Sequence, residues 1–456
     1  MKDLTQGSIP KHLISMALPI AVGLIVQTMY FLVDLYFVGQ LGGQAIAAVS
    51  SAGSLFFFIM ALTQVLNIGC STLVSHAVGR KNKDEANQIF NQSFRLALTA
   101  TVVLSLCGYL VGQTYFQFLA ADAKTTELAV SYFYWFLPSL TLQFVITVYS
   151  AALRGTGIVK PVMSRLMIGV ILNIVLSPIL IAGWGFGIEM GVAGAGLASS
   201  LSTLLTLMLL ISYFSKKESY LELSFAKYKS DNQIAKKLLK IGLPAGGEFL
   251  MTFFYMSIIY WALSSFSANA QAGFGLGVRL MQSLFLPVMA IAFAAPAIAG
   301  QNFAAGNSLR VKQTYHYTAV LTCSLMAILM LICLIAPEVF IVGFTSDPEV
   351  ILVATTFLSF IGLNFVPAGY VMTASGMFQA LGNTLPALIS TASRLTLFAL
   401  PVFYLASRSG FEIEHIWYCS VATVFIQAGI SYFLLNREFS KRLPEQDLAL
   451  NKKALT

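Results

Sequence analysis

Two carboxylates lie in stretches that are otherwise apolar, and their chemistry is the first feature to explain. Asp34 is the only acid in TMYFLVDLYFVGQ, residues 28–40, and Glu248 follows a glycine pair in LPAGGEFLM. The other seventeen of the nineteen acidic residues fall in polar connections, in tails or at the ends of apolar runs. Burial disfavours the charged form of a carboxylate, so an acid in such surroundings can load and release a proton.

Polar side chains recur at helical spacing near Asp34. Gln27 lies two turns before it and shares its face if this segment is a helix. Tyr30 and Tyr36 can line the same cavity. We therefore treat Gln27 as a candidate member of an ion site and the two tyrosines as candidate substrate contacts.

A kink is predicted earlier in the same segment, at Pro19 and Gly23. Proline removes one backbone hydrogen bond and clashes with the preceding turn. The bend either responds to protonation of Asp34 or is static and held by neighbouring helices.

A second polar group lies in GVILNIVLSPIL, where Asn173 and Ser177 are one turn apart on one face. They either complete a network around Asp34 or join helices through hydrogen bonds, each contributing about 1 kcal/mol or less in a membrane. Asp34 and Glu248 likewise act as coupling or cavity groups, or only fix helix packing. Arg394 also falls within an apolar run, where it snorkels inward or pairs with an acid or an anionic lipid.

The composition requires most of the chain to face lipid. Of 456 residues, 57% are hydrophobic and only 10% are charged, against roughly 25% charged in a typical soluble domain. The net charge of +8 is typical of basic loops beside a membrane, so no nucleic-acid partner is expected. The five cysteines lie in apolar runs without ligand spacing, so we expect no disulfide, metal site or cofactor.

The sequence predicts twelve transmembrane helices, each a run of roughly 20 mostly apolar residues. The longest polar connection, 215–237, follows the sixth and divides the chain into an N-lobe (1–214), a basic cytoplasmic linker and a C-lobe (238–456). The predicted spans are 13–37, 50–77, 94–118, 128–151, 161–183, 190–214, 238–265, 276–302, 314–337, 350–379, 384–406 and 415–436.

The distribution of basic residues predicts the orientation. With the N-terminus inside, the outside loops carry only Lys124 and Arg408. The remaining loop lysines and arginines, including Arg80, Lys81 and Lys83, fall on the inside, as does the basic C-terminal tail. This excess on one side predicts that both termini are cytoplasmic.

The two halves resemble each other. Pro19 and Pro244 both follow a leucine and lie 225 residues apart, and Pro161 and Pro386 in LRGTGIVKP and FQALGNTLP have the same separation. An even number of spans per half makes these parallel repeats, an arrangement typical of transporters that work by alternating access. No Walker A pattern occurs, so uphill transport would draw on an ion gradient.

In order and pattern these features resemble the multidrug and toxic compound extrusion (MATE) transporters. The Leu-Pro before a helix-one acid, AGQNFAAGN (299–307) and the LRGTG and FQALG segments carry the resemblance. It implies an all-α membrane fold of two pseudo-symmetric six-helix bundles in a V, exporting varied, often cationic drugs in exchange for H⁺ or Na⁺. The aspartate in VDxxxVG context is similar to the DinF-like branch.

That resemblance maps the branch's N-lobe network onto Gln27, Tyr30, Asp34, Asn173 and Ser199, the last in GAGLAS, and its kink onto Pro19 and Gly23. Related members often carry NxxxD where this chain has Asn173 and Ser177. Asp34 is then the sole carboxylate within the spans of the N-lobe, which favours protons over sodium.

We therefore expect a transporter rather than an enzyme: a proton-coupled multidrug antiporter of the bacterial inner membrane, monomeric and surrounded by lipid. The candidate coupling residues are Asp34, Asn173, Ser177, Gln27 and Ser199, and the candidate cavity residues are Tyr30, Tyr36, Asn173 and Glu248. The alternatives are a Na⁺-coupled member of the family, a lipid-linked precursor flippase, and a channel or membrane scaffold.

Overall fold

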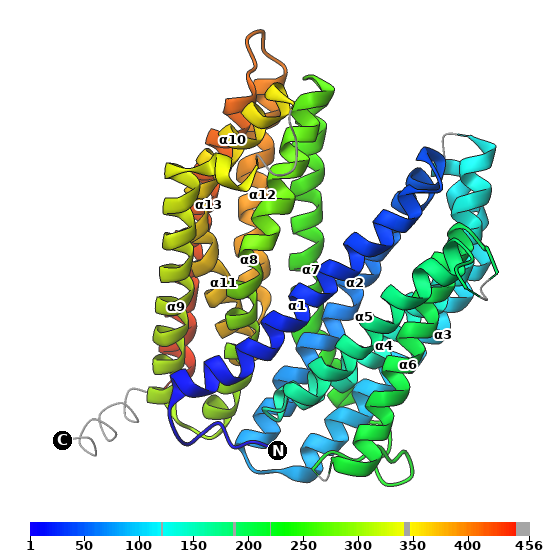
Figure 1. Cartoon of the computed structure of the whole chain (residues 1–456). Helices are drawn as coiled ribbons and strands as arrows, with labels where there is room; N and C mark the ends of the chain where they lie inside the picture. The colour runs from blue at the N-terminus through cyan, green and yellow to red at the C-terminus, as the bar shows by residue number, and fades with distance from the viewer. Residues whose placement is uncertain (120–121, 186–187, 219, 342–346, 444–456) are drawn as a thin grey trace. The chain divides into compact units, whose positions relative to one another are not determined.

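The computed structural model describes residues 1–119, 122–185, 188–218, 220–341 and 347–443, and this part of the chain contains helices and no strands (Figure 1). The apolar runs form long helices, several of which continue through an internal proline. The helices are α1 (Ile9–Gly39), α2 (Gly43–Gly79), α3 (Lys83–Leu119), α4 (Ala123–Gly155), α5 (Lys160–Ile181), α6 (Val192–Lys217), α7 (Asn232–Leu263), α8 (Ala268–Ala304), α9 (Ser308–Ile335), the short 3₁₀-helix η1 (Pro337–Phe340), α10 (Pro348–Gly362), α11 (Phe365–Ala380), α12 (Leu385–Ala406) and α13 (Ile413–Arg442).

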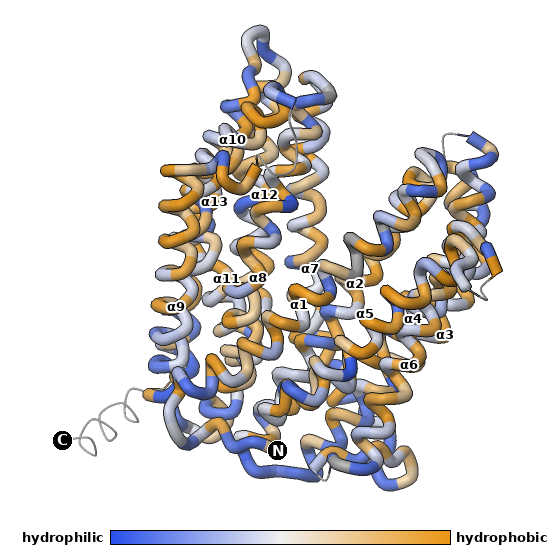
Figure 2. Tube along the Cα trace, in the orientation of Figure 1, coloured by the Kyte–Doolittle hydropathy of each residue, from blue (hydrophilic) through white to orange (hydrophobic). Residues whose placement is uncertain are grey.

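All twelve predicted spans fall on helices. Within the described residues, ten helices are long and apolar enough to cross a membrane, and the bent pair α10 and α11 makes eleven if it is one span. The remaining predicted span lies on α7, where Glu248 and a glycine pair lower the mean hydropathy. The chain is a multi-pass membrane protein, and Figure 2 shows hydrophobic residues along most of the helices.

The helices form two compact units, and both boundaries fall inside helices. One unit contains residues 1–3 and 22–242, and the other contains residues 4–21 and 243–456. The boundaries therefore lie near Pro19 in α1 and next to Pro244 in α7, the pair of prolines related by the repeat. The first turns of α7 belong to the first unit.

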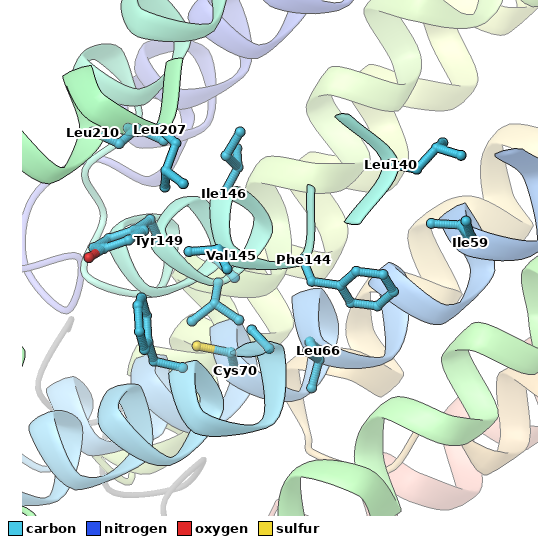
Figure 3. Packing of buried hydrophobic residues seen from close by; sticks show 14 of the residues in the cluster. Ile59, Leu66, Cys70, Leu140, Phe144, Val145, Ile146, Tyr149, Leu207 and Leu210 are labelled. Carbon is cyan, nitrogen blue, oxygen red and sulfur yellow. The ribbon is translucent and has the colours of Figure 1, made fainter. Parts of the chain in front are cut away.

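The core of the first unit is built around α4, which packs against α2, α3 and α6. Tyr149 on α4 meets the ring of Phe214 with centroids 4.5 Å apart, and Phe214 stacks on Phe90 at 5.3 Å. Figure 3 shows how Tyr149, Phe144 and their neighbours on α4 meet side chains of α2 and α6. Helix-on-helix packing of this kind buries the large aromatic residues away from lipid.

Glycines allow close helix approach in the same unit. A Cβ at Gly194 on α6 would overlap the carbonyl oxygen of Leu180 on α5. A Cβ at Gly196 would lie 2.6 Å from the carbonyl oxygen of Tyr132 on α4. Small residues at such crossings let van der Waals contacts replace lipid contacts. They fix where α5, α6 and the side chains they carry can lie.

The polar connection before α7 is held along α3, and we call residues 220–231 the strap. Asn87 accepts a hydrogen bond from the backbone N–H of Glu222, at 2.5 Å. Asn91 donates to the Glu222 carbonyl at 2.8 Å and accepts from the backbone N–H of Ser224 at 2.9 Å. Both asparagines are fully buried, so the strap covers polar groups that would otherwise need water.

The far end of the strap is fixed in the same way. Gln92 accepts from the backbone N–H of Asp231 at 3.0 Å. Arg95 donates to the carbonyl of Tyr228, and its guanidinium lies 4.9 Å from the ring centroid of Phe225. The backbone N–H and C=O groups of the strap are thus paired by amide side chains of α3, where a β-strand would be paired by a neighbouring strand.

The core of the second unit contains the fully buried Trp417 of α13, which stacks on Phe274 of α8 with centroids 5.6 Å apart. One element interrupts the regular packing: α10 and α11 are bent by 56° at a break formed by Leu363 and Asn364. The sequence indicated one continuous span at this point. A broken span leaves backbone and side-chain polar groups inside the unit.

The N-terminal segment also belongs to the second unit. Leu4 is fully buried, its N–H donates to Gln301 Oε1 at 3.0 Å, and its carbonyl accepts from Asn302 at 3.1 Å. Arg310 donates to the carbonyl of Gly7 at 3.0 Å. Two polar side chains of the AGQNFAAGN segment therefore hold the backbone at Leu4 against the end of α8.

We predict that Asn91→Ala loosens the strap. The substitution removes two hydrogen bonds to strap backbone, a loss of about 1–3 kcal/mol in the free energy of unfolding the strap from α3. Limited trypsin digestion should then cut faster at Lys227 and Lys229. Asn307→Ala in the second unit serves as the control, and equal cleavage rates in the two variants would contradict the role given to Asn91.

Candidate functional site

Three of the predicted coupling residues meet between α5 and α6. Asn173 donates to the hydroxyl of Ser199 at 3.4 Å, and Ser177 donates to Asn173 Oδ1 at 3.3 Å. All three side chains are buried. Distances of this length indicate weak bonds, so Asn173, Ser177 and Ser199 can change hydrogen-bond partners at low cost.

The approach of α5 to α6 at this level depends on Gly169. It lies one turn before Asn173 on the same face of α5, and a Cβ there would overlap the hydroxyl of Thr206 on α6. The missing side chain lets the helices come close enough for Asn173 to reach Ser199. This contact is visible only in the folded structure, although GxxxN spacing on one face was present in the sequence.

Asp34 lies at the level of these residues along α1. Gly23 of α1 is so close to Met163 of α5 that a Cβ would lie 2.7 Å from its sulfur. Phe37 meets Trp184, just after α5, with ring centroids 5.7 Å apart. The two helices therefore run parallel along this stretch, and Asp34, three residues before Phe37, falls at the level of Asn173 and the turn that follows it.

The carboxylate of Asp34 is buried, with 8% of the residue exposed. Its Oδ1 has no hydrogen-bond partner among the described residues. At about 100° per residue, Gly23, Asp34 and Phe37 share one face of α1, so Asp34 projects from the face that contacts α5. An orphaned carboxylate oxygen in a buried setting is costly unless the group is neutral or exchanges a proton.

The other predicted residues of α1 are placed differently. The side chains of Gln27 and Tyr36 are exposed, Tyr36 by 64%. The side chain of Tyr30 lies outside the described residues. Pro19 lies within α1, which continues through it without a break, and Gly23 marks the contact with α5. A bend that responds to protonation stays a prediction.

Glu248 has a partner that the sequence did not indicate. Its Oε2 accepts a hydrogen bond at 2.9 Å from Ser375 of α11. Both residues belong to the second unit. Helix α11 is the second half of the broken span, so the break places a serine against α7; nothing in the spacing of the sequence linked these two residues.

The sequence predicted that Arg394 snorkels inward or pairs with an acid or an anionic lipid, and in the structure it contacts a tyrosine. Its Nη2 donates to the hydroxyl of Tyr255 at 3.1 Å, and its guanidinium lies 4.4 Å from the centroid of that ring. None of the ion pairs in the described part of the chain involves this arginine. The sequence identified Arg394 as a charged residue in an apolar run but did not indicate Tyr255 as its partner.

The described residues hold no group of three His, Cys, Asp or Glu side chains that could bind a metal ion. A cavity of about 760 Å³ lies at the junction of α3 and α4 and includes Gln113, Asp122 and Glu127 in its lining. It is far along the chain from the groups above. The backbone N–H and hydroxyl of Thr125 donate to Asp122 and hold the pKa of that carboxyl below its usual range.

Known proteins share this sequence pattern and fold. The MatE family model matches residues 19–179 and 244–405, and these segments begin 225 residues apart. The predicted internal repeat is thereby confirmed. The two matches start at the prolines of α1 and α7 and together cover most of the chain.

Curated relatives and solved structures extend the match to nearly the full length. A multidrug export protein MepA of Staphylococcus haemolyticus is 26% identical over 440 residues, 95% of each chain. An FAD transporter of Shewanella oneidensis is 26% identical over 89% of this chain and 91% of its own. An outward-facing multidrug resistance MATE transporter has the same fold, with a TM-score of 0.89, 24% identity and coverage of 97% of this chain and 98% of its own.

The two matched repeats, the helical fold and the membrane spans lead to the same assignment. The chain belongs to the MatE family and is a membrane transporter, not an enzyme.

Proposed function

We propose that this protein is a proton-coupled multidrug efflux antiporter of the bacterial inner membrane, with both termini cytoplasmic. Export of drugs is supported by the relatives, among them a protein named for multidrug export. Residues of the first unit support protons as the coupling ion and Asp34 as their carrier.

The observation that carries the proposal is the buried Asp34 carboxylate with an unpartnered oxygen, level with Asn173 and Ser177. Removal from water favours the neutral form of a carboxyl group. A proton arriving from the outside neutralises Asp34, and its release to the cytoplasm restores the charge. A cationic drug would bind the charged form, so proton and drug compete for one group.

A dry sodium site needs several oxygen ligands, and this region offers few that are free. Asn173 Oδ1 already accepts from Ser177, and the Ser199 hydroxyl accepts from Asn173. Among the six spans that the sequence predicts in the N-lobe, only 13–37 contains an acid, Asp34. One carboxylate at the level of engaged amide and hydroxyl groups suits a proton better than a metal ion.

Two alternatives have different signatures. A Na⁺-coupled antiporter would need the oxygens of Asn173 and Ser177 as ligands. A flippase for lipid-linked precursors would need a cationic cavity for a pyrophosphate headgroup. The deep acids Asp34 and Glu248 do not suit such a headgroup and favour export of small molecules.

We predict that Asp34→Asn abolishes proton-driven drug efflux while expression and folding stay intact. The amide is nearly isosteric but cannot titrate, so the coupling step is lost. The measurement is efflux of a fluorescent cation from proteoliposomes with an imposed pH gradient, beside the thermal unfolding midpoint of each purified protein. Efflux at the wild-type rate by a folded Asp34→Asn variant would remove Asp34 from the mechanism.

We predict that wild-type efflux persists in sodium-free buffer when a pH gradient is imposed. A sodium gradient without a pH gradient should drive no more efflux than buffer alone. Parallel vesicles with potassium in place of sodium control for ionic strength. Strict dependence on sodium would establish the Na⁺-coupled alternative instead.

We predict that Ser177→Ala lowers transport mildly, because the hydroxyl makes a single weak bond to Asn173. Asn173→Ala should reduce transport more, since it disconnects Ser177 from Ser199. Initial efflux rates of the two variants, compared at equal protein density, test the order. A complete loss in Ser177→Ala alone would show that its hydroxyl has a direct role.

A further inference from the structure

Arg394 lies near the middle of α12, where a charged side chain is costly in a membrane and by default marks a functional site. Its guanidinium rests on the ring of Tyr255 and donates to the hydroxyl of that ring. The Nε–H is buried and has no hydrogen-bond partner among the described residues. The guanidinium of Arg394 therefore has one N–H donor, at Nε, that is not used within the described residues.

Three acids of the second unit have hydrogen-bond or ion-pair partners other than Arg394. Glu248 accepts from Ser375, and Glu349, at the other end of the unit, accepts from Ser267 and Asn269. Glu438 pairs with Arg442 at 2.9 Å. No carboxylate in the described part of the unit lies within ion-pair distance of Arg394, so its charge is uncompensated.

A hydrogen-bonded chain supports Arg394 without neutralising it. The Tyr255 hydroxyl is 2.7 Å from the hydroxyl of Ser420, which accepts at 3.1 Å from Asn364 in the break between α10 and α11. The Oδ1 of Asn364 is buried and has no partner among the described residues. Broken helices with free polar groups are where transporters place binding sites.

The spacing along α7 relates this cation to the buried acid. Glu248 and Tyr255 are seven residues apart, two helical turns and about 10 Å, on nearly the same face. One face of α7 thus carries Glu248, which bonds to α11, and two turns further along Tyr255, which bonds to Arg394 of α12.

We propose that Arg394 binds the carboxylate of an organic anion or zwitterion, with the positive end of a zwitterion toward Glu248. The guanidinium supplies a planar pair of donors that matches a carboxylate. Tyr255, Ser420 and Asn364 are positioning residues that hold the guanidinium. This assignment rests on the proposed function, because it names a substrate class that the same transporter would export.

The test compares rhodamine B, which carries a free carboxylate, with its ethyl ester, which is a plain cation. Fluorescence polarisation of each dye with the purified full-length protein in detergent gives the two dissociation constants. Arg394→Gln should weaken rhodamine B binding by roughly tenfold to a hundredfold, the effect of losing a hydrogen bond to a charged group. Binding of the ester should change less than about twofold, given that the ester makes no such bond.

A matched control is available in the first unit. Arg165 of α5 also lies over a tyrosine, 4.8 Å from the ring centroid of Tyr213, and Arg165→Gln should leave the ratio of the two dissociation constants unchanged. Arg394→Lys keeps the charge but not the planar donor pair, so it should weaken rhodamine B binding several-fold. This variant decides the question if Arg394→Gln does not fold.

Several outcomes would overturn the assignment. One is an unchanged ratio in Arg394→Gln or, where that variant is unfolded, in Arg394→Lys. Another is displacement of rhodamine B by a short-chain phosphatidylglycerol but not by benzoate, which would make the site a lipid site. Asp34→Asn separates this proposal from the proposed coupling role, because it should stop proton-driven efflux without altering the ratio.

Discussion

A polar group inside the hydrocarbon keeps its place only when the protein supplies its hydrogen bonds, and both units are organised around this constraint. In the first unit Asn173, Ser177 and Ser199 bond to one another across two helices. In the second, Ser375 bonds to Glu248 and Tyr255 to Arg394. Asp34, Asn364 and Arg394 are among the described residues left with an unpaired buried atom, and we propose them for proton and ligand binding.

Close helix contact makes these bonds possible. Gly169 brings α5 against α6 just before Asn173, and Gly194 brings the two helices together near their other ends. Near the start of α3 the same demand is met by asparagines, which hold the strap. The glycine contacts fix α5 and α6, which carry candidate site residues, and the asparagines fix the strap, which leads into α7.

The two units have related helix arrangements, but their buried charged residues occupy different positions. The repeat relates Asp34 to Ile259 and Glu248 to Gly23, so neither acid has a counterpart. Within the predicted spans, the first unit has the single acid Asp34, at the level of amide and hydroxyl groups, whereas the second has both the acid Glu248 and the arginine Arg394. These unequal polar groups on a common scaffold underlie our proposals that the first unit carries the ion and that the second contributes to substrate choice.

The sequence by itself determined the membrane fold, the repeat and the residues whose burial is expensive. Long apolar runs leave few choices in lipid, and an isolated charge such as Asp34, Glu248 or Arg394 is conspicuous in them. Only the tertiary structure decided the partners: Ser375 for Glu248, Tyr255 for Arg394, and the strap for α3. It also exposed Gln27 and Tyr36 and split the tenth span in two. These outcomes depend on contacts between residues far apart in the chain, because helical periodicity places a side chain on a face without naming the helix that the face meets.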